Sequence, residues 1–131
     1  MVSHDTISDI LIRIKNGQAA SLLSVTVPNS HISLAILNSL HDAGYIRGYK
    51  FLKESNEIDV LLGYSNNEPL IRDLKIISKP GHRVYWRYRR IRRASNTEKK
   101  TTFLLSTSRG VITTEKACLY KIGGLIICKI N

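Results

Sequence analysis

The chain has 131 residues, 43% of them hydrophobic, and its 20 Lys and Arg residues outnumber its 10 Asp and Glu residues, which gives a net charge of +10. This length and composition suit one compact unit or two small subdomains, and they exclude a disordered chain, a repeat solenoid and a membrane span of about 18 apolar residues. Two cysteines, Cys118 and Cys128, are too few for a disulfide framework and lack the spacing of a zinc site, so a reducing compartment is the simpler interpretation.

The first predicted element is an amphipathic helix. Apolar residues recur at the spacing of one helical face, and Asp5 is a plausible N-cap with Gly17 near the end of the helix. The apolar residues of this face are Ile7, Ile10, Leu11 and Ile14.

A strand, a second helix and a hairpin are predicted next. Residues 25–28 form a short strand that ends at a proline. Ser30 can cap the second helix, and Gly44 ends it. Residues 45–53 and 58–62 are predicted strands, and the polar residues between them form the turn of a hairpin.

Residues 63–69 are dense in turn-forming residues and mark the expected boundary between two subdomains, 1–66 and 67–131. After this boundary, residues 70–77 are apolar enough for a strand. A tight turn follows at 79–81.

The rest of the second subdomain is predicted to be mostly β. Residues 82–88 continue as a strand, residues 89–100 form an exposed loop or an irregular helix, and residues 102–105 form another strand. After a small-residue loop at 106–110, Thr114 caps a short helix that extends through Tyr120, with Glu115 in its first turn.

The last predicted element is an apolar strand at residues 125–130, which follows a break at Gly123 and Gly124. The expected fold class is α+β with two small, tightly packed subdomains. The N-terminal one is an α/β unit (helix-strand-helix-strand-strand), and the C-terminal one is mostly β with one short helix.

The positive charge is concentrated in the last two-fifths of the chain. Residues 1–78 hold 7 basic and 8 acidic residues, a net charge of −1, whereas residues 79–131 hold 13 basic and 2 acidic residues, a net charge of +11. Such segregation is typical of a surface for a polyanion, either nucleic acid or an anionic membrane. Charge for solubility is the alternative, although solubility does not require segregation.

The segment from Lys79 to Lys100 is the most basic one, with nine Lys and Arg residues against one acidic residue. Guanidinium groups pair with phosphates through two N–H donors, and interleaved aromatic rings can stack on bases or riboses. At least one of Tyr85, Trp86 and Tyr88 is expected in the core, because successive residues of a strand point to opposite faces. The candidate RNA contacts of this segment are Arg87, Arg89, Arg90, Arg92 and Arg93.

The loop at 106–110 is the second candidate site. Its short hydroxyl side chains suit 2′-OH groups and base edges, and its glycine would let another backbone approach closely. An ordinary turn after a strand is the alternative interpretation. The residues of this loop are Ser106, Thr107, Ser108, Arg109 and Gly110.

Motifs of enzymes are absent from the sequence. The four histidines lack the spacing of a metal site or a catalytic triad, and there is no nucleophile elbow, phosphate loop or dinucleotide fingerprint. We therefore expect no catalytic residue, no metal, no cofactor, no small-molecule substrate and no membrane partner. A hydrolase with a Ser/His site, built on His82 or Ser108, is kept as a rival class.

Four blocks of the chain, in order, resemble the small-subunit ribosomal protein S8 family. They are DTISDILIRIKNGQ (5–18), VPNSHIS (27–33) followed by AGYI (43–46), ISKPGHRVY (77–85) and STSRGVITTEKACLYKIGGLIIC (106–128). The last block is the most specific, because it combines the Ser-Thr-Ser loop, the short helix, the Gly-Gly pair and the cysteine of the final strand.

The resemblance implies a structural constituent of the small ribosomal subunit that binds ribosomal RNA directly and organises its central domain, with neighbouring ribosomal proteins as further partners. It assigns RNA contact to the Ser-Thr-Ser loop, with Arg83 and Tyr85 on the adjoining strand. It also implies a secondary contact in the first subdomain through Arg13, Lys15, Asn16 and Ser30. A free RNA-binding translational regulator that uses the same surface is the alternative.

Several positions depart from the family pattern. Leu125 stands where the family usually has an acidic residue, His31 and Ser33 replace basic residues, and a longer basic segment covers 86–102. Such departures suggest an organellar ribosome, and we expect the mitochondrial matrix; any import signal would then be uncleaved. The bacterial cytoplasm and the plastid are the alternatives.

Overall fold

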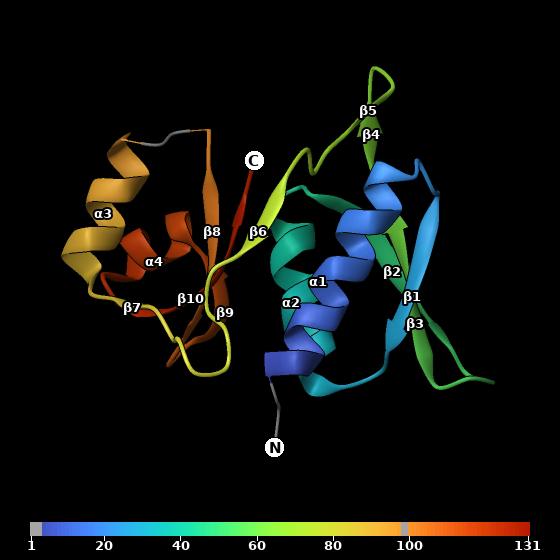
Figure 1. The fold of residues 1–131 in the computed structure, drawn as a ribbon, viewed down its shortest axis with the longest axis horizontal. Coiled ribbons are helices and arrows are strands. Elements are labelled where there is room, and N and C mark those ends of the chain that lie inside the picture. Colours follow the sequence, from blue (N-terminus) through green and yellow to red (C-terminus); the bar gives the residue numbers. More distant parts are fainter. Residues whose placement is uncertain (1–3, 98–99) are drawn as a thin grey trace. The chain divides into compact units, whose positions relative to one another are not determined.

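The computed structural model describes residues 4–97 and 100–131, which form two compact units, Met1–Arg72 (unit 1) and Asp73–Asn131 (unit 2). Both units mix helices and strands (Figure 1), so the expected α+β class is confirmed. Within the part of the chain that is described, no helix is long and apolar enough to cross a membrane.

Unit 1 is a three-stranded antiparallel sheet with two helices on one face (Figure 1). The strand order is β1-β3-β2, and a small two-stranded ribbon, β4-β5, follows at the turn-rich segment. Its elements are α1 (His4–Ala19), β1 (Ser24–Pro28), α2 (His31–Asp42), β2 (Ile46–Leu52), β3 (Glu57–Leu62), β4 (Tyr64–Ser65) and β5 (Glu68–Pro69).

Helix α1 is longer than its sequence pattern predicts. Its apolar stripe is buried as expected, but the helix begins at His4, so Asp5 lies inside the first turn and is not the N-cap. Gly17 lies near the end of the helix, as expected. A Cβ atom at Gly17 would lie 2.5 Å from Cγ1 of Val25, so the glycine also permits close packing of α1 on β1.

Helix α2 begins and ends as predicted. The Ser30 hydroxyl accepts a hydrogen bond from the Ser33 backbone N–H (3.2 Å), which satisfies one of the free donors at the start of the helix. Gly44, just beyond the helix, has a φ of +84°, a conformation that glycine adopts without strain. The β2–β3 hairpin is also confirmed.

Unit 2 is built on an antiparallel sheet in the order β6-β10-β8-β9, in which β7 also pairs with β10. Helices α3 and α4 pack against each other and against this sheet (Figure 1). The elements are β6 (Leu74–Ile76), β7 (Tyr85–Trp86), α3 (Tyr88–Thr97), β8 (Thr102–Thr107), β9 (Gly110–Thr113), α4 (Thr114–Tyr120) and β10 (Gly124–Ile130).

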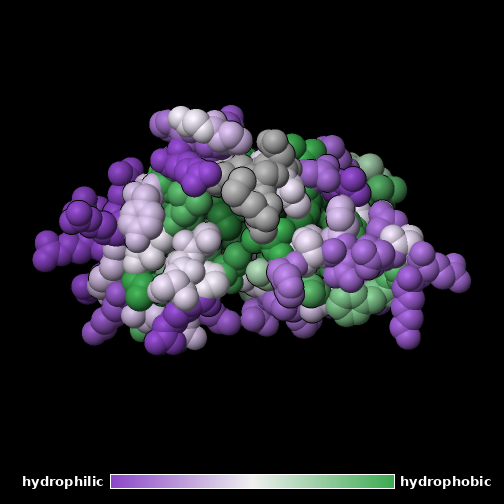
Figure 2. Space-filling view, turned by 90° about the horizontal axis from the view of Figure 1, so that it is seen from below, coloured by the Kyte–Doolittle hydropathy of each residue, from purple (hydrophilic) through white to green (hydrophobic). Residues whose placement is uncertain are grey.

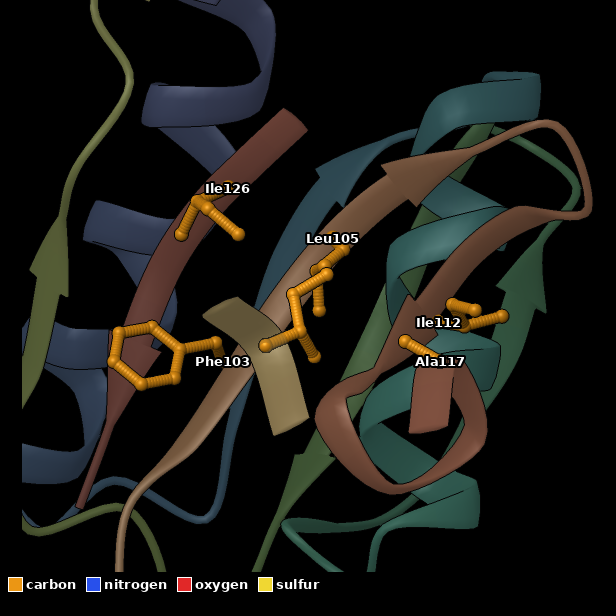
Figure 3. Packing of buried hydrophobic residues seen from close by; sticks show 6 residues of the cluster. Phe103, Leu105, Ile112, Ala117 and Ile126 are labelled. Carbon is orange, nitrogen blue, oxygen red and sulfur yellow. The ribbon is translucent and has the colours of Figure 1, made fainter. Parts of the chain in front are cut away.

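The core of unit 2 lies between the sheet and its two helices. Figure 3 shows side chains from β8, β9, β10 and α4 gathered there, and Trp86 and Ala94 pack against the cluster at its margin. The buried members are Ile91, Phe103, Leu105, Ile112, Ala117 and Ile126. This core holds β7, α3 and the β8–β9 hairpin in place within unit 2.

Three local predictions for unit 2 need correction. The strand expected at 82–88 contains only two residues, and the one expected at 70–77 contains only three. The segment after β7 is a regular helix as far as Thr97, which resolves the alternative left open for residues 89–100 over that part; residues 98 and 99 lie outside the described residues. Thr114 does not cap α4. Its buried hydroxyl instead accepts from the Phe103 N–H (2.8 Å) and donates to the Phe103 carbonyl oxygen (3.1 Å), which ties α4 to β8.

Candidate nucleic-acid interface

The β8–β9 hairpin carries the hydroxyl-rich residues at its tip. Ser106 pairs with Val111 and Thr107 pairs with Gly110, which leaves only Ser108 and Arg109 in the turn. The expectation of a five-residue loop at 106–110 is therefore wrong at both ends. Ser106 and Thr107 belong to β8 and Gly110 belongs to β9, because the pairing of the two strands continues almost to the tip. Gly110 permits this tight turn through its φ of +94°.

The three hydroxyl groups of the hairpin have different environments. The Thr107 hydroxyl donates to the Gly110 carbonyl oxygen (2.9 Å) and accepts from the Arg109 N–H (3.1 Å), so it holds the turn together. Ser106 is half-buried within β8. Ser108 is exposed, and its hydroxyl group has no hydrogen-bond partner among the described residues. Ser108 is thus the hydroxyl most available to a ligand.

Arg109 is held beside the tip by an aromatic ring. Its guanidinium carbon lies 4.4 Å from the ring centroid of Tyr120 on α4. Such a cation–π contact is worth about 0.5–1 kcal/mol at an exposed site. The arginine therefore has a preferred position on the α4 side of the hairpin, although both side chains remain accessible.

Gly123 and Gly124 let three strands come together behind the hairpin tip. A Cβ atom at Gly123 would lie 2.5 Å from the Trp86 carbonyl oxygen, and one at Gly124 would lie 2.6 Å from the Ser106 carbonyl oxygen. Side chains here would force β7 or β8 away from β10. The Gly-Gly pair therefore has a packing role that its interpretation as a break before the last strand did not include.

Tyr85 lies on the same face of the sheet as Ser106. Leu125 on β10 pairs with Tyr85 on one side and with Ser106 on the other, and directly paired residues point to the same face. Two strand spacings separate their Cα atoms by about 10 Å. Because Tyr85 is 66% exposed, its ring is open to a ligand that also contacts the hairpin.

Trp86 is the aromatic residue of this segment that joins the core. Its ring packs edge-on against Phe103, with centroids 4.9 Å apart. The guanidinium carbon of Arg90 lies 4.7 Å from the Trp86 ring centroid. The expectation that one of the three aromatics belongs to the core is therefore confirmed.

Helix α3 has one fully buried residue, and exposed arginines lie on either side of it in the sequence. Ile91 is fully buried, whereas the flanking arginines are exposed. In residues 4–97 and 100–131, none of these arginines forms an ion pair with a carboxylate. Figure 2 shows hydrophilic side chains projecting from the end of unit 2 that carries α3. The exposed arginines are Arg89, Arg90, Arg92 and Arg93.

Arg83 and Arg87 flank β7 rather than lying on it. Both are exposed, and the expected place of Arg83 on the strand is wrong, because β7 begins only at Tyr85. The chain before β7 is held by Ser78, whose hydroxyl group accepts from the Val84 N–H (3.0 Å). Arg87 joins β7 to α3, and its carbonyl oxygen accepts the first hydrogen bonds of that helix.

Two residues of the expected secondary contact have structural partners in unit 1. Arg13 forms an ion pair with Asp9 (3.2 Å) and donates to the Thr26 carbonyl oxygen (2.9 Å). Ser30 caps α2. The other two residues of this set, Lys15 and Asn16, are exposed on α1.

Replacing Ser30 with alanine is expected to lower the free energy of unfolding by about 1 kcal/mol, because one N–H at the start of α2 loses its partner. Ser30→Asp should retain most of that stability, since aspartate is an equally good cap. Urea unfolding of the two variants measures the difference. Equal stability of Ser30→Ala and the natural chain would show that the cap contributes little.

Cys128 offers no reactive centre. Burial raises the pKa of the Cys128 thiol to about 12, and a backbone hydrogen bond with Leu104 offsets this only in part. The thiol is therefore protonated at neutral pH and is a poor nucleophile. Across the described residues, no group of three or more His, Cys, Asp or Glu side chains could hold a metal ion.

Comparison with known proteins gives one consistent result. The family model described as ribosomal protein S8 matches residues 5–131. The small ribosomal subunit protein uS8m of Acanthamoeba castellanii is 36% identical over 125 residues, which cover 95% of this chain and 98% of that protein.

Bacterial proteins match over a similar length. The small ribosomal subunit protein uS8 of Bradyrhizobium sp. (strain BTAi1) is 37% identical over 130 residues, with 97% of each chain covered. The uS8 protein of Chromobacterium violaceum is 38% identical over 130 residues, with 98% of each chain covered. The resemblance seen in the four sequence blocks is confirmed, and the chain belongs to the ribosomal protein S8 family.

Proposed function

We propose that this protein binds the RNA of the small ribosomal subunit directly and organises the central domain of that RNA during assembly and translation. Membership of a family of small-subunit ribosomal proteins supports the placement of this protein in the small ribosomal subunit. The observation that carries direct RNA binding is the exposed Ser108 hydroxyl, which has no hydrogen-bond partner among the described residues and lies at the tip of a hairpin that Thr107 holds together in the basic unit.

Binding would proceed in two physically different parts. The arginines of α3 attract phosphates over a long range without regard to sequence, and they release counterions from the RNA. The hairpin tip then recognises local shape, because a short hydroxyl group reaches 2′-OH groups and base edges more closely than an arginine can. Tyr85, on the same sheet face, offers a flat surface beside the tip.

Unit 1 would make the smaller contribution to RNA binding. Lys15 and Asn16 are its available candidates, while Arg13 and Ser30 are engaged in holding the fold. We place the protein in the mitochondrial ribosome, which the similarity to uS8m supports. Neighbouring ribosomal proteins would complete its partners. The role is structural, not catalytic.

Crosslinking of the native protein within isolated small subunits tests this function. Ultraviolet crosslinks to RNA are expected in the peptides that contain residues 83–93 and 106–110. Depletion of the protein should also make the 2′-OH groups of the central RNA domain more reactive to acylating reagents. A protein that sediments with the small subunit but crosslinks only to other proteins would contradict direct binding, and one that sediments free of the subunit would favour the regulator.

A further inference from the structure

A groove between β7 and α3 combines flat aromatic surfaces with a dense set of cations. Its floor includes Trp86, which the core holds in place through Phe103. The helical wall also contributes the small side chain of Ala94 and the hydroxyl group of Thr97. The aromatic and cationic lining residues are Tyr85, Trp86, Arg87, Arg89, Arg90 and Arg93.

The planar groups of the groove are already oriented. Arg90 lies over the Trp86 ring at 4.7 Å, and the Trp86 ring packs on Phe103 at 4.9 Å. A side chain that is held flat before binding loses less conformational entropy when a ligand stacks on it. Tyr85 also borders the groove and is 66% exposed, but its side chain leaves β7 on the opposite face of the sheet from Trp86, so the stacking surface is the Trp86–Arg90 pair.

The charge of the groove is uncompensated. None of its lining residues is acidic, and no carboxylate pairs with its arginines within the part of the chain that is described. Like charges at this density repel one another, so an anionic occupant is strongly favoured over a neutral one.

We propose that this groove holds an unpaired nucleotide of the bound RNA, with its base against the aromatic and guanidinium planes and its flanking phosphates on the arginines. This inference rests on the proposed function and names the form of RNA that the site takes. In a duplex, the faces of the bases are covered by their neighbours, so only a bulged or single-stranded nucleotide can use the stacking surfaces. A site for phosphates alone would not need the ordered Trp86–Arg90 pair.

The single tryptophan of the chain lies in the groove and gives a direct readout. We would titrate the full-length protein with hexauridylate while recording Trp86 fluorescence. An abasic hexamer with the same phosphates and a short RNA duplex serve as the comparison ligands. Hexauridylate is expected to quench the fluorescence and to bind about fivefold or more tightly than the abasic hexamer, the lower bound for one stacked base.

Three variants separate stacking from charge. Arg90→Lys keeps the charge but loses the guanidinium plane over Trp86, so it should remove much of the preference for hexauridylate over the abasic hexamer. Arg93→Gln should instead weaken the binding of both ligands by the same factor. Arg47→Gln is the matched control, because it removes one exposed arginine from β2 of unit 1 and should change neither affinity. Arg90 and Arg93 are both exposed, and circular dichroism would verify that each variant folds.

Equal affinity for hexauridylate and the abasic hexamer, in the natural chain and in Arg90→Lys alike, would overturn the inference in favour of a simple phosphate site. Quenching by hexaglutamate as strong as that by hexauridylate would overturn it in favour of an acidic protein segment. Either result leaves the proposed function standing if the hairpin peptide still crosslinks to ribosomal RNA. Loss of all RNA crosslinks in the native subunit would instead remove the proposed function itself.

Discussion

Simultaneous replacement of Arg89, Arg90, Arg92 and Arg93 with glutamine is expected to weaken RNA binding roughly a hundredfold or more at low salt. Each phosphate contact contributes about 0.7–0.9 to the slope of log affinity against log salt concentration. Loss of four such contacts should therefore make the slope shallower by about 3. Filter binding of a ribosomal RNA fragment and of a generic duplex, each across a range of salt concentrations, measures both quantities.

The same four positions changed to lysine provide the matched control. Lysine keeps the charge, so the salt slope should stay close to that of the natural chain, although planar contacts are lost. The glutamine variant without RNA should melt at a higher temperature in low salt, because like charges no longer repel one another on α3. An unchanged slope in a folded glutamine variant would mean that α3 faces away from the RNA.

Unit 1 could be predicted almost entirely from sequence periodicity. The buried stripe of α1 repeats every three to four residues, and Ser30 combines a capping side chain with an apolar helical pattern just after it. Local signals of this kind agree with the tertiary structure. The error was the N-cap at Asp5, since the helix already begins at His4. The close packing of Gly17 on β1 is a tertiary contact, which no local pattern reveals.

Unit 2 was harder because its local signals are weak. Helix α3 has only Ile91 and Ala94 as inward apolar residues among many arginines. Two apolar residues are too few to show the repeat that is typical of a helix. Thr114 looked like a cap because it precedes a short helix, yet its hydroxyl group satisfies the backbone of a strand that is distant in sequence. Tertiary hydrogen bonds of this type cannot be inferred from one segment alone.

For the candidate site, too, the sequence identified the segments but not their positions relative to one another. Charge and hydroxyl content identified the segments, because those properties belong to the sequence itself. Their placement depends on the ladder that sets Tyr85 and Ser106 on either side of Leu125, and on the two glycines that let these strands approach. The distinction between Thr107, which holds the turn, and Ser108, which is free to bind, required the structure.

Replacing Ser108 with alanine is expected to weaken binding to the cognate ribosomal RNA by roughly five- to a hundredfold. Loss of one donor from a contact that is buried in the complex typically costs about 1–3 kcal/mol. The variant should bind a generic RNA duplex as well as the natural chain does, with the same salt slope, because the hydroxyl group carries no charge. Filter binding of the two RNAs across salt concentrations separates this loss of recognition from the loss of attraction expected for the α3 variant.

Thr107→Val is the informative partner of Ser108→Ala, because the two hydroxyl groups are adjacent but differ in their role. Ser108 has no hydrogen-bond partner among the described residues, so its removal should leave the urea unfolding midpoint unchanged. Thr107 holds the turn through two hydrogen bonds, so its removal should lower that midpoint as well as RNA affinity. If Ser108→Ala lost cognate and generic binding equally, or lost neither, the hairpin tip would be an ordinary turn and recognition would lie elsewhere on unit 2.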